Sequence, residues 1–180
     1  ARFIGSFINK YLIFESGSSI LLIDQHAAQE LIFYEKFIVQ LSQGRIEIQH
    51  LLSPVLIALS PAERLMLDEL KAGFEEAGLT ATLFDEETLA IHAHPALMKD
   101  VEKAVRGLLS GEKRAKFDHD TIARRACRSS IMTGDKLSRE QAEHQRNELI
   151  KCLDAFTCPH GRPIVVALTE DFLDKQFLRT

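Results

Sequence analysis

Three short stretches of the sequence contain side chains that bind metal ions in proteins. They are Asp24-Gln25-His26-Ala27-Ala28-Gln29-Glu30 near the start, Ala126-Cys127-Arg128 far downstream, and Cys158-Pro159-His160-Gly161-Arg162-Pro163 near the end. No stretch makes a site alone, but together they supply two thiols, two imidazoles and two carboxylates. That set suffices for one tetrahedral Zn²⁺ site or for two divalent ions. If the fold brings the stretches together, we expect a hydrolytic or regulatory metal centre.

The spacing within these stretches fits a shared ligand space, although each pattern also has an ordinary structural explanation. His26 and Glu30 are four residues apart, so on a helix their Cβ atoms lie on one face, roughly 5 to 6 Å apart. Such a pair is often a plain surface interaction, and Asp24 in front of it fits a helix N-cap. Cys158 and His160 lie in a turn that prolines make rigid, which is also compatible with incidental ligands. A lone helical Cys127 is commonly a core residue.

Composition limits the class of protein. With 180 residues, 46% of them hydrophobic, the chain can bury a core in one domain or two small subdomains. Its three cysteines, an odd number without a signal-peptide pattern, favour a reducing compartment and a cytoplasmic protein. No apolar run approaches the roughly 20 residues of a membrane helix, so we expect no membrane association. The chain begins at Ala1 rather than methionine, which we interpret as a fragment of a larger protein.

The net charge bears on nucleic-acid binding. A formal charge of −4 means that the domain as a whole repels a phosphate backbone. Weak binding to duplex DNA is therefore expected from this domain alone. Another domain, a second subunit or a protein clamp on DNA would have to deliver it.

Hydrophobic periodicity predicts the elements that position the metal-binding stretches. A hairpin is expected from strands at 2–14 and 20–23 with a turn at 16–19, followed by a helix from 25 to 41 that stops before Gly44. Ser60 and Glu63 form a capping box for a helix that stops at Gly78. Strands are expected at 80–84 and 88–92 and helices at 96–109 and 120–127. Ser138-Arg139-Glu140-Gln141 caps a further helix to about 154, and a buried strand at 163–168 rejoins the first sheet. His92 and His94 are expected on an exposed strand face.

These elements predict an α+β fold with two subdomains. Residues 1–52 and 118–180 are expected to form a sheet-plus-helices subdomain, into which a smaller α+β subdomain, residues 53–117, is inserted. The first metal-binding stretch would span a strand-to-helix junction, where backbone N–H groups and side chains converge.

The motifs as a set resemble the C-terminal domain of the MutL mismatch-repair endonucleases. The matching residues are Asp24-Gln25-His26-Ala27-x-x-Glu30-x-x-x-x-Glu35, Ala126-Cys127-Arg128, Cys158-Pro159-His160-Gly161-Arg162-Pro163 and Phe177-x-Arg179. Four ordered motifs that span residues 24 to 179 are far more specific than any one of them. The resemblance implies a metal-dependent nickase that cuts DNA near a mismatch and forms a homodimer through residues 1–52 and 118–180. It also implies a regulatory role for the external subdomain 53–117, an N-terminal ATPase domain in the full-length chain, and a mismatch-recognition protein as partner.

The resemblance also implies a role for each motif residue. Metal ligands would be His26, Glu30, Cys127, Cys158 and His160, and the catalytic carboxylates would be Asp24 and Glu30. Carboxylates suit Mn²⁺ or Mg²⁺, whereas cysteine and histidine favour Zn²⁺, so a regulatory or structural zinc beside a catalytic ion is expected. Arg128, Arg162 and Arg179 would orient carboxylates or neutralise phosphate, with buried salt bridges as the alternative. Glu35 would orient a ligand.

A further segment resembles the short motif by which MutL proteins dock on the β sliding clamp. Gln49, Leu51, Leu52 and Pro54 supply an amide, two apolar anchors and a rigid end. The alternative is an ordinary linker between subdomains.

Two other functions stay open on the sequence alone. One is a non-catalytic dimerisation and clamp-docking module whose zinc is structural. The other is an unrelated zinc hydrolase of a small molecule, which the order of the motifs disfavours. The fragment has no glycine-rich nucleotide loop, so no ATP site is expected in it.

Overall fold

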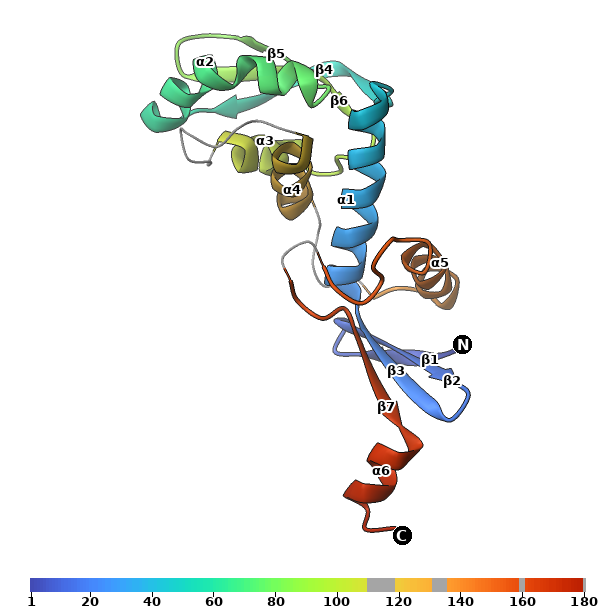
Figure 1. The fold of residues 1–180 in the computed structure, drawn as a ribbon. Coiled ribbons are helices and arrows are strands. Elements are labelled where there is room, and N and C mark those ends of the chain that lie inside the picture. Colours follow the sequence, from blue (N-terminus) through green and yellow to red (C-terminus); the bar gives the residue numbers. More distant parts are fainter. Residues whose placement is uncertain (110–118, 131–135, 159–160, 180) are drawn as a thin grey trace. The chain divides into compact units, whose positions relative to one another are not determined.

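The computed structural model describes residues 1–109, 119–130, 136–158 and 161–179, with the backbone alone for Arg125 and for residues 127–130. Its α+β fold is the predicted one (Figure 1). The elements in chain order are β1 (Arg2–Phe7), β2 (Tyr11–Ser16), β3 (Ser19–Asp24), α1 (Gln25–Gln43), β4 (Ile48–Ala58), α2 (Pro61–Glu76), β5 (Thr80–Leu83), β6 (Thr88–Pro95), α3 (Val101–Leu109), α4 (His119–Ser130), α5 (Arg139–Leu149), β7 (Val165–Thr169) and α6 (Glu170–Gln176).

The chain divides into two compact units. Unit 1 comprises Ala1–Ile32 and Met132–Thr180, and unit 2 comprises Phe33–Ile131. The predicted inserted segment, 53–117, lies within unit 2, which also includes the second half of α1 and α4. The functional division into a dimerisation and endonuclease part and a regulatory part stays a prediction.

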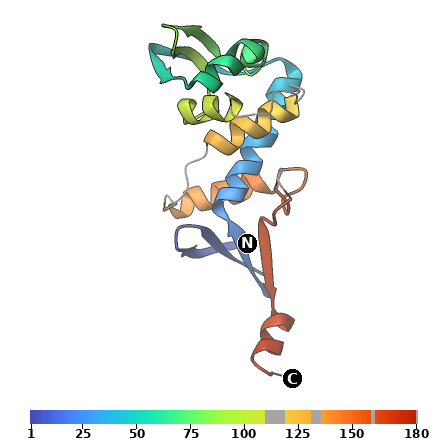
Figure 2. The ribbon, with the colours of Figure 1, turned by 90° about the vertical axis from the view of Figure 1, so that its left-hand side faces the viewer.

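Unit 1 is built on a four-stranded antiparallel sheet in the order β1-β2-β3-β7. Strand β7 joins this sheet, as predicted, by pairing with β3, and the two run side by side in both views (Figures 1 and 2). The prediction that this strand is buried is wrong, because its side chains are half-buried or exposed. The single strand predicted for 2–14 is wrong, because Ile8 and Asn9 adopt positive φ and turn the chain, with Lys10 N–H bonded to Phe7 O at 3.1 Å. An apolar isoleucine within this turn gave no sequence signal for it.

Helix α5 covers one face of this sheet. Its capping box at Ser138 is the predicted one, although the helix ends at Leu149 rather than near 154. The Arg146 guanidinium lies 5.7 Å from the Phe14 ring centroid, and Arg139 lies 6.0 Å from that of Phe3. These stacked cations and the buried rings beneath them fix which face of the sheet is covered.

Unit 2 packs α2, α3, α4 and the second half of α1 around a three-stranded antiparallel sheet in the order β4-β6-β5. The predicted capping box of α2 is present, and the helix stops before Gly78, whose φ is +77°. Helix α3 begins at Val101, later than predicted, since the Asp100 carboxylate accepts the Lys103 N–H at 3.0 Å and caps it.

Two features of the three-stranded sheet differ from expectation. Residues 48–58 form the long strand β4, which the sequence pattern did not reveal. His94 is 4% exposed rather than exposed, because β6 is the central strand and both of its faces are buried. In the described part of the chain, no helix is both long and apolar enough to cross a membrane.

Candidate metal centre

The β3–α1 junction is held firmly in unit 1. Asp24 ends β3, and its backbone N–H donates to Ile164 O at 2.9 Å. The next residue, Gln25, donates its N–H to Lys10 O at 2.8 Å. The Asp24 Oδ1 atom accepts the Ala27 N–H at 2.9 Å, so Asp24 is the N-cap of α1. Backbone contacts on both sides therefore fix where this carboxylate lies.

His26 and Glu30 follow on the first turns of α1. Glu30 is 8% exposed, which is rare for a carboxylate outside a functional or paired setting. His26 Nδ1 is a buried atom with no hydrogen-bond partner among the described residues. Buried polar atoms in proteins nearly always have a partner, so we expect Nδ1 to bind a group that is not among the described residues.

Cys158 lies in a tight turn that backbone hydrogen bonds between its described residues close. The Cys158 N–H donates to Arg162 O at 2.9 Å, and the Gly161 N–H donates to Cys158 O at 2.9 Å. The Arg162 N–H points at the Cys158 sulfur, 3.3 Å away. This thiol is 4% exposed and forms no disulfide. The turn therefore presents one buried, oriented sulfur.

Ile164 joins this turn to the β3–α1 junction. Its N–H donates to Phe156 O at 2.8 Å, just before Cys158, while its carbonyl accepts the Asp24 N–H. The backbone of Ile164 thus bonds both to the segment that leads into Cys158 and to Asp24, which are more than a hundred residues apart in the sequence. The pairing of Ile23 with Val165 continues the contact into the sheet.

The donor types at this junction suit a metal ion, although they do not form a complete site. No three metal-binding side chains cluster among the described residues, which do not include the side chains of Cys127 and His160. The buried imidazole nitrogen of His26 and the buried thiol of Cys158 are the donors that zinc prefers. The carboxylates of Asp24 and Glu30 suit a hard cation. The residues present therefore fit a metal centre that needs further ligands.

Comparison with known proteins decides the family. Residues 4–137 match the family described as the MutL C terminal dimerisation domain. The chain belongs to this MutL family. Curated relatives named DNA mismatch repair protein MutL are 33% identical over 187 residues in Clostridium tetani, 34% over 185 in Endomicrobium trichonymphae and 33% over 185 in Methanothrix thermoacetophila.

Each of these alignments covers 99% of this chain but only 30%, 31% and 33% of the respective MutL relative. The chain therefore spans about a third of the curated relatives that it matches. The alignments include the Cys158 turn, which lies beyond the 4–137 match. Relatives named for mismatch repair agree with the resemblance that the motifs indicated.

Other MutL motif residues belong to unit 2, are exposed, or have side chains that the structure does not describe. His160 is not among the described residues, and Cys127 and Arg128 lie on α4 in unit 2 with only their backbone described. Glu35 is half-buried on the part of α1 that belongs to unit 2, and the Arg162 side chain is exposed. Their roles at a metal stay predictions.

Arg179 lies at the other end of unit 1 from Asp24. Strands β3 and β7 pair Ile23 with Val165 and Ser19 with Thr169, so β7 leads away from the junction and into α6 (Figure 1). The Arg179 guanidinium lies 5.9 Å from the Phe177 ring centroid. Within one chain, the structure does not bring Arg179 to the β3–α1 junction that holds Asp24.

The predicted clamp-binding segment lies in β4, at an edge of the three-stranded sheet. The pairing with β6 shifts between His50 and Val55, so residues 51–54 bulge from the ladder. Leu52 in this bulge has an exposed fraction of 108%, and Pro54 is exposed. The segment is therefore a strand with an exposed bulge and not the linker that was the alternative.

One polar network in unit 2 was missed by sequence reasoning. Tyr34 on α1 donates its hydroxyl to Asp120 Oδ1 on α4, and Arg124 Nε donates to Asp120 Oδ2 at 2.7 Å. The hydrogen bond from Arg124 is the main cause of the lowered pKa of Asp120, while burial and then Asp120 raise the pKa of Tyr34. The four-residue spacing of Asp120 and Arg124 is visible in the sequence, but nothing local points to Tyr34. This network anchors the helix that carries Cys127.

Proposed function

We propose that this chain is the metal-dependent DNA-nicking endonuclease domain of a MutL-type mismatch-repair protein, which introduces strand breaks in mismatch-containing duplex DNA. The observation that carries the proposal is the backbone link through Ile164 between the Asp24 junction and the Cys158 turn. It supports the proposal because Asp24 and Cys158, which the two family motifs contribute as candidate ligands, belong to one unit.

The side chains divide between two kinds of ion. His26 and Cys158, with Cys127 and His160, would hold a regulatory or structural Zn²⁺. Asp24 and Glu30 would hold Mn²⁺ or Mg²⁺, which when bound supplies polarisation of the scissile phosphate. Capping engages Asp24 Oδ1, while Oδ2 makes no hydrogen bond within the described residues, so Oδ2 is the oxygen that would meet the ion.

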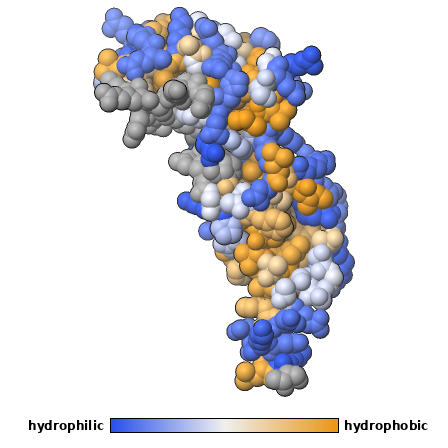
Figure 3. All heavy atoms as spheres, in the orientation of Figure 1, coloured by the Kyte–Doolittle hydropathy of each residue, from blue (hydrophilic) through white to orange (hydrophobic). Residues whose placement is uncertain are grey.

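We further propose that the domain forms a homodimer through the face of the four-stranded sheet opposite α5. Cross-strand pairing places Ile13, Leu22 and Val166 in one row of that face, and Ile20 and Leu168 in the next. Val166 is 51% exposed. Apolar side chains gather over β3 and β7 in Figure 3. An apolar sheet face of this kind, in a family described by dimerisation, fits a second copy.

Dimer formation can be tested by Val166→Lys with sedimentation velocity. We expect the variant to shift towards monomer, because a cation would be buried against an apolar row. Val39→Lys on α1 is the matched control, since Val39 is similarly exposed at 49% but lies in unit 2. A Val166→Lys dimer as stable as wild type would contradict the proposed face.

The resemblance to MutL proteins also implies the remaining partners, and the charge of the domain is consistent with one of them. The acidic balance disfavours strong binding of DNA by this domain alone, so the β sliding clamp, docked on Gln49, Leu51, Leu52 and Pro54, would deliver it. The N-terminal ATPase domain of the same chain and a mismatch-recognition protein would control when it cuts. The curated relatives that the chain matches are about three times its length.

A supercoiled-plasmid nicking assay with Mn²⁺, with and without loaded clamp, tests the function. We expect wild-type nicking that the clamp increases, and loss of nicking in Asp24→Asn with bound zinc and folding retained. Glu69→Gln, a change of an exposed carboxylate on α2, is the control for lost charge. Nicking that persists in Asp24→Asn would refute the catalytic assignment.

Bound zinc, counted by mass spectrometry, separates the alternatives. His26→Ala and Cys158→Ala should each lose zinc. If wild type binds zinc and dimerises but does not nick even with the clamp, the domain is a structural dimerisation and clamp-docking module instead.

A further inference from the structure

Unit 2 has a cavity with an apolar floor beside a strand edge that no other described strand pairs with, and no motif residue described above lines it. The cavity measures about 340 Å³ and lies between α2 and β5. Its floor consists of nearly buried apolar side chains: Leu67, Phe74, Leu79 and Leu89, which are 7%, 3%, 2% and 1% exposed. Its rim is polar, with Asp68, Lys71, Glu75, Thr80 and Thr82.

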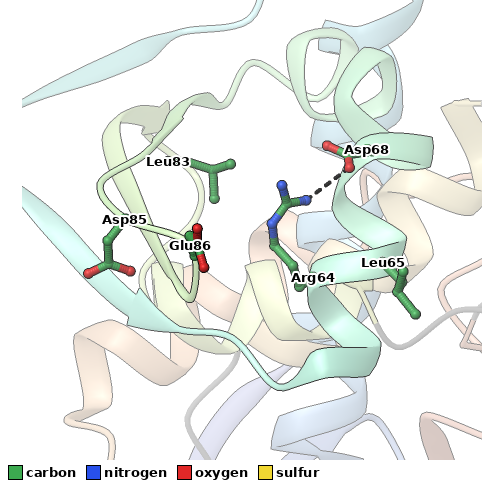
Figure 4. A pocket seen from close by; sticks show the side chains of 6 residues that line it. All are labelled: Arg64, Leu65, Asp68, Leu83, Asp85 and Glu86. Atoms are coloured by element: carbon green, nitrogen blue, oxygen red, sulfur yellow. Dashed lines mark hydrogen bonds and ion pairs between the residues drawn. The ribbon is translucent and has the colours of Figure 1, made fainter.

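A second, shallower depression continues this cavity. It is lined by Arg64, Leu65, Asp68, Leu83, Asp85 and Glu86, and so shares Asp68 and Leu83 with the first (Figure 4). Large apolar side chains remain uncovered around it, with Leu65 at 66%, Leu83 at 42% and Phe84 at 68% exposure. The two depressions together form a groove along β5, here called the β5 groove.

The β5 strand has a free backbone edge along this groove. In the described residues β5 pairs only with β6, on one side. The Phe84 N–H bonds to Thr88 O at 2.9 Å, and antiparallel pairing alternates from there. The N–H and C=O groups of Ala81 and Leu83 therefore point away from β6, towards the outside of the sheet. Both residues also line the cavity, so backbone and apolar contacts are offered together.

The charges around the β5 groove are mostly negative. Its lining includes the carboxylates of Asp68, Glu75, Asp85 and Glu86 against the cations Arg64 and Lys71. Arg64 is already paired with Asp68 at 2.9 Å, as the dashed line in Figure 4 marks. Asp85 accepts the Glu87 N–H at 2.9 Å, which lowers the pKa of Asp85 and keeps it ionised. The charge of this groove therefore favours a basic ligand and disfavours the phosphate backbone of a nucleic acid.

We propose that the β5 groove docks an extended, basic segment of a partner protein as an added strand. The segment pairs with the backbone of Ala81 and Leu83, inserts one apolar side chain over the cavity floor, and sets lysine or arginine against Asp68 and Glu86. This interaction goes beyond the proposed nuclease function and does not depend on it, since none of these residues belongs to the candidate metal centre.

Selection of random decapeptides displayed on phage against the whole domain tests the proposal. We expect enrichment of sequences that alternate apolar residues with two or more lysines or arginines. A fluorescein-labelled peptide of the enriched sequence should then slow hydrogen exchange at the Ala81 and Leu83 amides. No enrichment over the starting library, enrichment without basic residues, or protection elsewhere, for example at Leu52, would overturn the proposal.

Variants locate the contact. Leu83→Pro removes an N–H that points away from β6, so the sheet keeps its own bonds while peptide affinity falls about tenfold. Leu83→Ala keeps the N–H and serves as its backbone control. The double variant Asp68→Asn, Glu86→Gln should weaken binding and reduce its salt dependence even if Leu83→Pro fails to fold. If the double variant binds the peptide as tightly as wild type does, the charge assignment is refuted. If the wild-type domain self-associates and the double variant does not, the occupant of the groove is a second copy of the chain and not a partner protein.

Discussion

Asp24 Oδ1 accepts the backbone N–H of Ala27 at 2.9 Å, so the proposed catalytic carboxylate also caps the helix that carries His26 and Glu30. Asp24 therefore has a structural role as a helix cap in addition to its proposed catalytic role. The two roles can be separated by comparing two substitutions. Asparagine keeps an oxygen acceptor at the cap, whereas alanine removes it.

We expect Asp24→Ala to lower the free energy of unfolding by about 1 kcal/mol, and Asp24→Asn to leave it nearly unchanged. Both variants should lose nicking, because neither has a carboxylate. Urea unfolding of chelator-treated protein measures the stability difference without a contribution from bound metal. Equal destabilisation by both changes would show that the cap does not explain the effect.

Leu52→Ser should abolish binding to the β sliding clamp without changing the melting temperature. The Leu52 side chain is fully exposed in the β4 bulge, so its removal loses no packing within the chain. Leu56→Ser is the control, because Leu56 is on the same strand, half exposed, and outside the predicted motif. Surface plasmon resonance on immobilised clamp measures the binding. Normal clamp binding by Leu52→Ser would contradict the docking assignment.

Acid should weaken the contact between α1 and α4. The pKa of Asp120 is lowered in the folded protein, mainly by the hydrogen bond from Arg124. The ionised carboxylate therefore stabilises the fold above about pH 4, the ordinary pKa of an aspartate in an unfolded chain. That contribution is lost as the pH falls through the lowered folded pKa. Chemical unfolding should show that, between about pH 5 and 2, the free energy of unfolding falls less steeply with decreasing pH in Asp120→Asn than in wild type. Parallel curves would show that Asp120 is not responsible.

Alkali should weaken the same contact through Tyr34. Its pKa is raised, first by burial and then by the hydrogen bond to Asp120, so the protonated phenol stabilises the fold below about pH 10. This stabilisation is lost as the pH rises through the raised folded pKa. Tyr34→Phe should be less stable near neutral pH and should lack this alkaline loss. Ultraviolet absorbance of tyrosinate reports the titration alongside the unfolding measurements.

Gly78→Ala should destabilise unit 2 by about 1 to 3 kcal/mol. Gly78 has a φ of +77°, and a Cβ there would lie 2.8 Å from Ile48 Cδ1 and 3.1 Å from Ile46 Cγ2. Gly44→Ala is the matched control, since Gly44 has a φ of +61° but no atom within 4 Å of the added Cβ. Gly44→Ala should therefore lower the melting temperature less than Gly78→Ala does. Equal shifts would mean that backbone strain alone, and not the isoleucine contacts, sets the cost.

The sequence by itself determined the features that depend on neighbouring residues. The capping boxes at Ser60 and Ser138 and the stop at Gly78 are present as predicted, because each rests on bonds or backbone geometry within a few residues. The same locality explains the errors. The Ile8–Asn9 turn carries no usual turn residue at its first position, and the burial of His94 depends on layers that other segments supply.

Tertiary structure alone decided which distant residues meet. The link from Asp24 through Ile164 to the Cys158 turn, the bond between Tyr34 and Asp120, and the free edge of β5 beside an apolar cavity all join or expose groups far apart in the chain. Motif order in the sequence indicated that the ligands belong together, and the family match agreed with it. Local propensity carries no information on these contacts, because strand pairing and helix packing are fixed by the burial of apolar surface over the whole unit.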